Sequence, residues 1–542
     1  MTDPAAAPLM PRDALALRAL AEIPKILTLQ DRTPVSPTYG CFDRAYWHYR
    51  MMDFPCGMSQ EFVLPLALAW ALDMPGNRWF GDPALREWAI AGIRFAARSA
   101  HADGSCDDYY PFERAAGAAA FSLYAALRAA DLLDCAGDPE IAAFLRLRGR
   151  WLAHHKESGR LSNHEALIVN CLARLRALTG AAEWDRPLAE RAARLKSWQD
   201  AEGWFDEYGG ADPGYLSLTI GLMAETDRLR PDLGLREPCA RAIAFIDHFV
   251  HPDGSAGGEY TSRGTRNFFP HGFEIAGAWN EAALRINDRA LTMLQHDRHP
   301  CYADDHIVGH HVWSWMTSWA EWQHMRPAPQ PLPQGRIHFP SARLLADHAP
   351  GSHLFLGTSR GGAFKLFGDR ALIHSDTGPT LATDTGKVAV THLEGSVLAE
   401  EGPDTLVIEG RMAWAKSARL TPAKSVILRV LMLGFGRFFP DLVRRMLQAV
   451  LVTGRKDAPF TFRRIFTRVP DGWAVRDEVR PDRGWQGIAR AGISGFQTST
   501  TTIMARVWAP DQAQPWHDCT DALAALPDGA PLIVERRFGG GQ

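Results

Sequence analysis

The sequence predicts an α+β chain of two domains, an N-terminal (α/α) barrel, closed or incomplete, followed by a C-terminal antiparallel β-sandwich with a helical insertion. Three observations predict this order. Apolar residues recur with helical spacing up to about residue 325, a proline-rich run follows directly, and strand-like alternation begins after that run. The 542 residues also exceed what one ordinary core holds, which favours more than one domain.

The helical domain is expected to cover residues 1–325. Apolar positions at spacings of three and four, with Gly or Asp-Pro at the ends, predict helices at 62–72, 86–100, 113–133 and 163–180. A loosely repeated phrase separates helices: a tight Gly turn followed by acidic and aromatic residues, at 103–109, 202–208 and 253–260. Such repeats are typical of stacked helical hairpins whose loops gather at one rim, as in a barrel. An irregular helical domain is the alternative.

A linker is predicted at 326–335, where four prolines alternate with other residues and exclude a helix. Residues 336–542 form the predicted sandwich. Alternation with a period of two, bounded by Gly and Asp-Pro turns, predicts strands in the segments 353–368, 387–400, 404–420, 472–480 and 501–510.

The segment 424–456 interrupts the strand pattern. It predicts two short helices separated by 434–440, and it is basic and apolar together, with a single acidic residue, Asp441. Its apolar runs are shorter than the ~20 residues that span a bilayer. Two interpretations remain open: an amphipathic hairpin that contacts a membrane surface peripherally, or an insertion packed on one of the domains. Its arginines are Arg429, Arg437, Arg444, Arg445 and Arg455.

Composition excludes several classes of protein. The formal charge of −3 provides no overall basic field, so no nucleic-acid partner is expected. The eight cysteines are scattered without a C-x-x-C pair, which argues against a disulfide framework and a zinc knuckle. The N-terminal residues lack a basic stretch followed by an apolar one, so we expect a cytoplasmic protein, peripheral to the inner membrane if 424–456 contacts lipid.

The first cluster of candidate functional residues opens the helix predicted at 163–180. Ser162, Asn163 and Glu165 are all residue types that a helix start favours, so capping alone explains them equally well. Capping does not require His164 at this position. The cluster is therefore a candidate site with a structural alternative.

Two further clusters lie in Gly- and Pro-rich loops. The first holds Glu207, Tyr208 and Tyr215, and it presents a phenol at a helix start, where simple packing is the alternative. The second interleaves polar residues with three phenylalanines, a pattern typical of a loop that lines a cleft. Its polar residues are Arg263, Arg266, Asn267, His271 and Glu274.

These motifs resemble the fingerprint of the heparinase II/III-like polysaccharide lyases, a superfamily that includes oligoalginate lyases. The matching residues are the Asn163-His164 pair, Tyr215 in a Gly/Pro loop some fifty residues later, and His271 beyond it. The resemblance implies an (α/α) toroid followed by an antiparallel β-sandwich. It also implies β-elimination within an acidic, uronic-acid-containing polysaccharide or oligosaccharide.

Such an elimination has three requirements: neutralisation of the C6 carboxylate, a base for the C5 proton and an acid for the leaving oxygen. The resemblance implies that Asn163 binds the carboxylate and that Tyr215 is the acid. It also implies that His164 neutralises the carboxylate or abstracts the C5 proton, and that His271 assists with either task. We add Arg263 and Arg266 as residues that would bind a carboxylate or a sulfate of the sugar. The segment 424–456 and the missing signal suggest a role in bacterial exopolysaccharide processing.

Weaker candidates complete the predicted site. Trp47, Gln60 and Tyr110 lie in aromatic and polar stretches that fit either a sugar subsite or the core. His306 and His310 have the i,i+4 spacing of a metal pair, but no accompanying carboxylate motif, so no cofactor is expected.

Two rival functions remain. One is an (α/α)-barrel glycoside hydrolase, which needs two carboxylates facing each other; Asp206, Glu207, Asp212, Glu259 and Glu274 are the candidates. The other is a non-catalytic polysaccharide-binding or assembly protein, since fold alone does not determine function.

Overall fold

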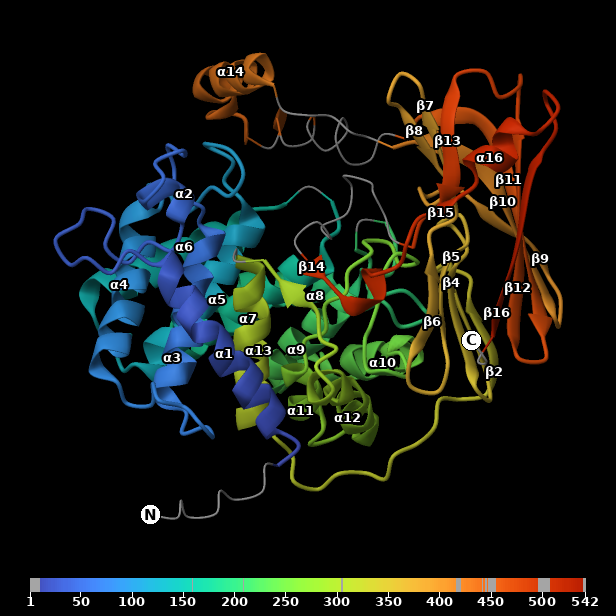
Figure 1. The fold of residues 1–542 in the computed structure, drawn as a ribbon. Coiled ribbons are helices and arrows are strands. Elements are labelled where there is room, and N and C mark those ends of the chain that lie inside the picture. The colour runs from blue at the N-terminus through green and yellow to red at the C-terminus, as the bar shows by residue number, and fades with distance from the viewer. Residues whose placement is uncertain are drawn as a thin grey trace, which may run out of the picture.

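The structure is a computed structural model. It describes residues 10–157, 159–207, 209–303, 306–415, 421–440, 442–443, 446, 455–495 and 507–539. Figure 1 shows a helical part on one side and two sheets on the other, in the chain order that the sequence predicts.

The helical part contains α-helices and short 3-10 helices. They are α1 (Asp13–Leu29), α2 (Arg44–Trp47), η1 (Met58–Phe62), α3 (Val63–Ala71), α4 (Pro83–Ser99), α5 (Ala116–Leu132), α6 (Pro139–His154), α7 (Ser162–Thr179), η2 (Ala182–Trp184), α8 (Asp185–Lys196), α9 (Pro213–Leu229), η3 (Pro231–Leu233), α10 (Arg236–Ile246), η4 (Asp247–Phe249), α11 (His271–Ala276), α12 (Glu281–Gln295) and α13 (His306–Ala320).

Three of these helices begin with the same local signal. Asp82, Asp138 and Asp212 are the N-caps of α4, α6 and α9, and each carboxylate accepts a hydrogen bond from the first backbone N–H groups of its helix. A proline follows each aspartate at the first helical position, where its missing N–H costs nothing. The Asp-Pro pairs of the sequence thus mark helix starts.

The helices form two layers. The inner helices α3, α5, α7, α9, α11 and α13 contact one another in this order, and α13 returns to α3. Outer helices α4, α6, α8, α10, α12 and α1 pack on them one by one. Every second helix therefore faces the centre, which explains why most residues of α5, α7 and α9 are buried.

The repeated Gly turns dock each hairpin onto an outer helix. Gly104, Gly203 and Gly254 all have a left-handed backbone, with φ between +88° and +100°. A Cβ added at these positions would meet the backbone of α6, α10 and α12 at 2.6–2.8 Å. Only glycine fits both the turn and this close approach.

The sheet part is antiparallel throughout. A five-stranded sheet has the order β2-β3-β4-β5-β6, and a nine-stranded sheet has the order β15-β13-β7-β8-β10-β11-β12-β16, with β9 paired to β10. The strands are β2 (Gly335–Phe339), β3 (Leu344–Ala349), β4 (Ser352–Gly357), β5 (Ala363–Phe367), β6 (Leu372–Asp376), β7 (Pro379–Thr383), β8 (Val388–Val390), β9 (Val397–Glu401), β10 (Thr405–Trp414), β11 (Asp457–Val469), β12 (Gly472–Pro481), β13 (Ile488–Ile493), β15 (His517–Asp518) and β16 (Leu532–Gly539); the short helices η8 (Pro510–Gln512) and α16 (Thr520–Ala524) lie between the last strands.

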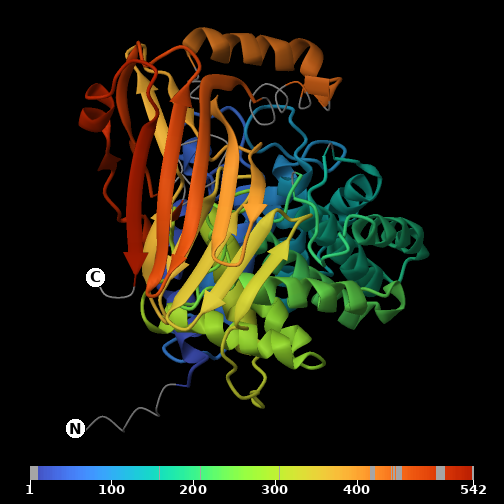
Figure 2. The ribbon, with the colours of Figure 1, turned by 90° about the vertical axis from the view of Figure 1, so that its right-hand side faces the viewer.

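The five-stranded sheet is buried on both faces. Leu354, Leu356 and Phe364 belong to the core shared with the nine-stranded sheet, while Phe355 and Phe367 belong to the core of the helical part. Because successive side chains of a strand point to opposite faces, β4 and β5 are buried at every position. This sheet is the layer that joins the two halves of the molecule (Figures 1 and 2).

One predicted strand lies elsewhere. Residues 501–506 are outside the described part of the chain, and β14 (Val507–Trp508) pairs with β1 (Cys301–Tyr302), which directly precedes α13. Strand β14, the described strand of the segment predicted at 501–510, therefore joins neither large sheet and pairs with the chain just before α13.

The insertion forms α14 (Pro422–Leu431), which continues into a π-helical turn, η5 (Met432–Gly436). Most of its second predicted helix lies outside the described residues. Figure 1 shows α14 above the helical part and away from the sheets. Arg429 forms an ion pair with Asp53, at 2.7 Å. Within the described part of the chain, no helix combines the length and apolarity needed to cross a bilayer.

Candidate functional site

The start of α7 is organised around one buried carboxylate. Ser162 donates a hydrogen bond to Glu207 at 3.0 Å, and the backbone N–H of Asn163 lies 3.5 Å from the same oxygen. The N-cap residue is Leu161, with no side-chain cap. The capping explanation of Ser162 and Asn163 is therefore wrong: both lie inside the first turn, and Glu207 satisfies the donors that a cap would have served.

Glu207 and Asn163 are 2% and 1% exposed. Burial raises the pKa of the Glu207 carboxyl, because the charged form is poorly solvated there. The positive charges of His164 and Arg263 act in the opposite direction. The side chains of His164 and Arg263 therefore lie close enough to Glu207 to interact electrostatically with its carboxylate. The side-chain oxygen of Asn163 is buried and accepts no hydrogen bond from the residues that the structure describes.

His164 lies at the edge of this cluster. Its side chain is 21% exposed, and Nδ1 lies 2.8 Å from a carboxylate oxygen of Glu157. The ring rests on α5, where a Cβ added to Gly117 would lie 2.4 Å from Cε1. The edge of the His164 ring also faces Phe121, with centroids 6.2 Å apart. Glycine in α5 thus lets an imidazole approach the inner helix directly.

Asp212 ties the loop of Tyr215 to the loop of Arg263. One of its oxygens accepts the N–H of Tyr215 at 3.0 Å, and the other accepts the N–H of Arg263 at 3.2 Å. Thr261 and Thr265 also donate to it. Tyr215 and Arg263 are both partly exposed. The structure therefore places Asn163, His164 and Arg263 around Glu207, and Asp212 joins the backbone of Tyr215 to that of Arg263.

The sheet part adds two residues that sequence reasoning missed, Arg360 between β4 and β5 and His392 after β8. Burial lowers the pKa of Arg360, in the turn between β4 and β5, and the charge of Arg263 lowers it further. Burial likewise lowers the pKa of His392 to about 4, and the charge of Arg360 adds to that effect. Arg360 and Gly210 line one small cavity between the helices and the sheets.

A signal for these residues exists in the sequence, but it is indirect. Arg360 precedes Gly361 and Gly362, which have φ of +63° and +66° and form the hairpin turn. Apolar residues at nearly every position of β4 and β5 indicate a sheet buried on both faces. A turn at the edge of such a sheet has to lie beside the helical domain.

His271 lies apart from this cluster. Its side chain is fully buried at the start of α11, with Nδ1 2.8 Å from the hydroxyl of Ser314 and the ring against Gly221 of α9. Burial lowers the pKa of His271 to about 4. Asn267 is also buried and lies 3.2 Å from His311.

Two predicted substrate-binding residues form ion pairs within the protein. Arg266 is 6% exposed and contacts Glu259 and Asp511, so its guanidinium is neutralised by two carboxylates. Glu274 is fully buried and accepts hydrogen bonds from Arg326, at the start of the proline-rich run.

The remaining candidates lie in other surroundings. Trp47 donates to the carbonyl of Leu29 at 2.8 Å, and Gln60 is 2% exposed in η1. Tyr110 is partly exposed in the loop before α5. Tyr208 lies outside the described residues.

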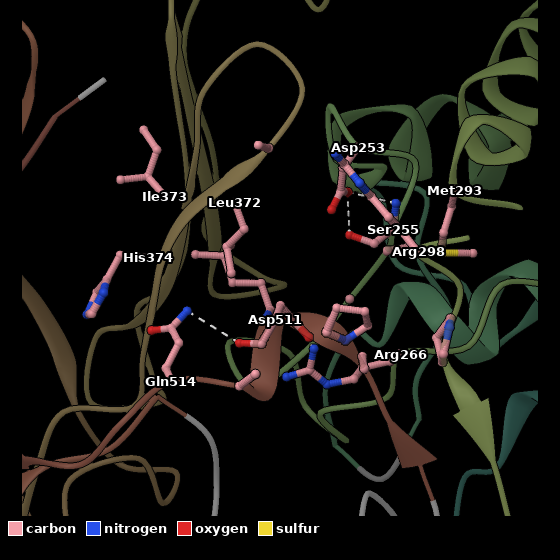
Figure 3. Close-up of a pocket in the computed structure, with 18 of the residues that line it drawn as sticks. Asp253, Ser255, Arg266, Met293, Arg298, Leu372, Ile373, His374, Asp511 and Gln514 are labelled. Atoms are coloured by element: carbon pink, nitrogen blue, oxygen red, sulfur yellow. Dashed lines mark hydrogen bonds and ion pairs between the residues drawn. The ribbon is translucent and has the colours of Figure 1, made fainter. Parts of the chain in front are cut away.

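A cavity of about 630 Å³ lies between the helical part and the sheets (Figure 3). Arg266, Lys365 and Asp511 line it, and Lys365 extends from the helix-facing side of β5 to form ion pairs with Asp511 and Glu259. Asn163, His164 and Tyr215 are not among the described residues that line this cavity. It is thus a space distinct from the Glu207–Asp212 cluster.

Of the predicted metal pair, His310 contacts Glu61 through Nδ1 and stacks on Phe121, with ring centroids 4.3 Å apart. His306 lies beside Cys56 and Asp108. In the described part of the chain, these three are the one group of His, Cys and carboxylate side chains with metal-ligating distances: their ligand atoms all lie within 4.8 Å of one another.

Neither a protein-family model nor a curated protein matches the chain. The structure is similar to that of the chondroitin AC lyase of Streptomyces coelicolor A3 in complex with chondroitin sulphate. The TM-score is 0.57 at 11% identity, over 100% of this chain and 81% of that one. It is also similar to a Paenibacillus xanthan lyase, with a TM-score of 0.52 at 11% identity, over 88% of this chain and 46% of that one. The chain thus has a heparinase/chondroitinase-like polysaccharide lyase fold, as the motifs predicted.

Proposed function

We propose that this protein is a polysaccharide lyase that cleaves a uronic-acid-containing polysaccharide or oligosaccharide by β-elimination. The observation that carries the proposal is the grouping of Asn163, His164 and Arg263 around Glu207, with the backbone of Tyr215 joined to that of Arg263 through Asp212. These are an amide, an imidazole, a guanidinium and a phenol, the groups that the reaction needs, in a fold similar to that of known lyases.

In the proposed reaction, the first task is to neutralise the C6 carboxylate of the sugar. Arg263 supplies a positive charge, and Asn163 supplies an amide at a position shielded from bulk water. Glu207 acts as a positioning residue, because its carboxyl binds Ser162 and Asn163 at the first turn of α7. Its raised pKa favours the protonated form, which limits repulsion of an anionic substrate.

The second task is proton transfer. A base removes the C5 proton, the electron pair forms the C4–C5 double bond, and the C4–O bond breaks as an acid protonates the leaving oxygen. We assign the acid to Tyr215 and the base to His164 or to the Tyr215 phenolate. Glu157 lies 2.8 Å from His164 Nδ1 and orients the ring. His271 takes no part in this scheme, because its Nδ1 binds Ser314 of α13 and its ring packs against Gly221 of α9.

The same proposal extends to the architecture. We interpret the closed ring of inner and outer helices as an (α/α) toroid within 1–325, joined by the linker 326–335 to a β-sandwich within 336–542. Contacts from α3 round to α13 support the toroid, and the apolar core shared by the two sheets supports the sandwich.

Few of the candidate carboxylates are available for catalysis by the rival function, a glycoside hydrolase. Asp212 accepts hydrogen bonds from several donors, Glu259 forms ion pairs with Arg266 and Lys365, and Glu274 binds Arg326. A hydrolase needs one carboxyl to act as an acid and a second to act as a base or nucleophile. This set of structural pairings favours the lyase over the hydrolase.

The test is a screen of the purified protein against alginate, heparin, hyaluronan, glucuronan and bacterial exopolysaccharides. A lyase forms an unsaturated uronate that absorbs in the ultraviolet, whereas a hydrolase forms a saturated end. With the best substrate, Tyr215→Phe should lose about 100-fold or more in kcat at an unchanged Tm. A Tyr215→Phe variant with wild-type kcat would remove the proposed acid. A cleaving wild type without the absorbance would favour the hydrolase, and binding without cleavage would favour the non-catalytic protein.

We also propose that 424–456 contacts an anionic membrane surface, which would fit a role in exopolysaccharide processing. Apolar side chains of this segment are 43–67% exposed, an unusual density for a surface. They are Val426, Ile427, Val430, Leu433, Phe435, Phe438, Phe439, Leu442 and Met446. The segment is also strongly basic, so its charge complements anionic lipid headgroups.

Sedimentation with vesicles tests this contact. Wild-type protein should bind vesicles that contain phosphatidylserine, bind neutral vesicles more weakly and dissociate at high salt. Ile427→Asp with Val430→Asp should abolish binding, whereas Val397→Asp, at a 62% exposed apolar position on β9, should not. Equal binding of both variants would contradict the proposal, and dimerisation in place of lipid binding would assign the apolar surface to a second copy of the chain.

A further inference from the structure

We propose that Cys56, Asp108 and His306 bind one divalent metal ion of the zinc class, with a fourth coordination position left to water. Their ligand atoms lie within 4.8 Å of one another. They come from three separate segments: the loop before η1, the loop before α5 and the first residue of α13. An ion at this point would join segments that are otherwise about 50 to 250 residues apart in the sequence.

The donor set determines the class of ion. One thiolate, one imidazole and one carboxylate are ligands typical of Zn²⁺, whereas Mg²⁺ and Ca²⁺ prefer oxygen alone. Ligand atoms around a tetrahedral zinc ion lie roughly 3.3–3.8 Å apart, given bond lengths of about 2.0–2.3 Å. Cys56 and Asp108, now 3.0 Å apart, would separate slightly, and distances of up to 4.8 Å within the group would close by about 1 Å.

Binding would exchange one proton for the metal. The thiol of Cys56 lies 3.0 Å from Asp108 and donates a hydrogen bond to it. As the metal–sulfur bond forms, the thiol proton leaves to solvent and the freed Asp108 oxygen turns to the metal. Affinity should therefore rise with pH.

The loops that carry two of the ligands are firmly held. The N–H of Cys56 donates to Asp43 at 2.9 Å, and the N–H of Gly57 donates to the carbonyl of Asp107 at 2.7 Å. A Cβ added to Gly57 would lie 2.4 Å from the sulfur of Cys106. The two loops are thus packed backbone to backbone, so the ligands are positioned before any ion arrives.

The structure also separates His306 from the histidine that sequence spacing paired with it. His310 is fixed by Glu61, which also accepts the indole N–H of Trp313 at 2.7 Å. Its ring centroid lies 5.7 Å from that of His306. His310 therefore packs beside the His306 ring from the next turn of α13. The other two proposed ligands, Cys56 and Asp108, come from other segments of the chain.

The site lies near the candidate catalytic cluster. His310 stacks on Phe121, and Phe121 faces His164. An ion held by His306 would fix the start of α13 on one side of this aromatic row while His164 lies on the other. The metal proposal does not depend on the lyase proposal, because it is tested by binding alone.

Cobalt provides the probe, because a Co²⁺–thiolate bond gives a charge-transfer band in the near ultraviolet. Full-length protein treated with a chelator should bind one equivalent of Co²⁺ with this band, and Zn²⁺ should displace it. Cys56→Ser should abolish the band and weaken Zn²⁺ binding by at least about tenfold in calorimetry. Cys301→Ser removes an exposed thiol and should change neither.

A second variant guards against misfolding of the first. Asp108→Asn keeps the size of the side chain and removes its charge, so it should retain the band and weaken affinity. Far-ultraviolet circular dichroism confirms the fold of each variant. A wild type without the band, or a Cys56→Ser variant with an unchanged band, would overturn the proposal. A band lost only in Cys301→Ser would assign cobalt to the exposed thiol and also overturn it.

Discussion

Two histidines of the helical part occupy matching positions and have opposite surroundings. The ring of His164, on α7, rests on Gly117 of the neighbouring inner helix α5, and the ring of His271, on α11, rests on Gly221 of α9. The side chain of His164 is 21% exposed, whereas His271 is fully buried. The packing of an imidazole on a helical glycine therefore occurs at an accessible position in one case and in the core in the other.

The position of the glycine along its helix explains the difference. Gly117 is in the first turn of α5, so the imidazole above it lies at the rim where the interhelical loops gather. Gly221 is in the third turn of α9, so the imidazole above it lies within the body of the ring. A short motif around a histidine carries no information on this depth.

The largest expected effect concerns the exposed histidine. His164→Ala should reduce turnover by about 10²–10⁴-fold, because it removes a group proposed to neutralise the sugar or take its proton. Tm should change little, since the side chain is at the rim. Initial rates of ultraviolet absorbance on the best polysaccharide, with circular dichroism, measure both quantities. His271→Asn serves as the partner variant and should keep turnover within a few-fold of wild type; equal losses in the two variants would remove the distinction between the two sites.

The buried histidine should instead be visible in the pH dependence of stability. The pKa of His271 is lowered to about 4 in the folded protein, against 6.5 for an ordinary histidine. Between these values the unfolded chain binds a proton that the folded chain does not, so stability falls as pH falls from 6.5 to 4. This histidine contributes roughly 3 kcal/mol to that loss.

Denaturant unfolding of wild type and His271→Asn from pH 7 to pH 4 measures the effect. The variant should lose less stability across this range than wild type. His296→Asn, at an exposed position, should follow wild type. If stability fell equally with pH in wild type and in His271→Asn, the pKa of His271 would not be lowered in the folded protein.

The smallest effects come from the two glycines themselves. Gly221→Ala should lower the free energy of unfolding by about 1–3 kcal/mol, since the added Cβ would lie 2.3 Å from His271 in a closed core. Gly117→Ala should change stability by less than about 1 kcal/mol, because His164 can swing outward, and should lower turnover about tenfold. Gly137→Ala, where a Cβ meets nothing within 4 Å, is the control. The opposite pattern, lost activity in Gly221→Ala and lost stability in Gly117→Ala, would contradict this view.

Much of the fold follows from local sequence pattern. The helix predicted at 62–72 is α3 (Val63–Ala71), and the helix predicted at 163–180 is α7 (Ser162–Thr179). Alternation at 353–368 corresponds to the hairpin of β4 and β5. Periodicity is a property of neighbouring residues, so these elements need no knowledge of the tertiary structure.

The site was predicted only in part, because its geometry depends on distant contacts. Spacing indicated Asn163, His164 and Tyr215, but Glu207 binds the start of α7 and Asp212 binds the loop of Arg263 through contacts that span about 45 to 50 residues. Arg360 comes from the other domain, and no local pattern connects it to Arg263. Arg266 resembles a substrate-binding arginine in the sequence, yet its partners Glu259 and Asp511 are visible only in the folded chain.

The sheet with two buried faces makes the halves of this molecule inseparable. If a protease cut the proline-rich run, the fragments would remain associated, held by the apolar side chains of β3, β4 and β5 that enter the helical core. Expressed alone, residues 336–542 would present that face to water and would tend to aggregate. Heat should therefore melt helices and sheets in one transition, and evolution could exchange neither half without redesigning the surface between them.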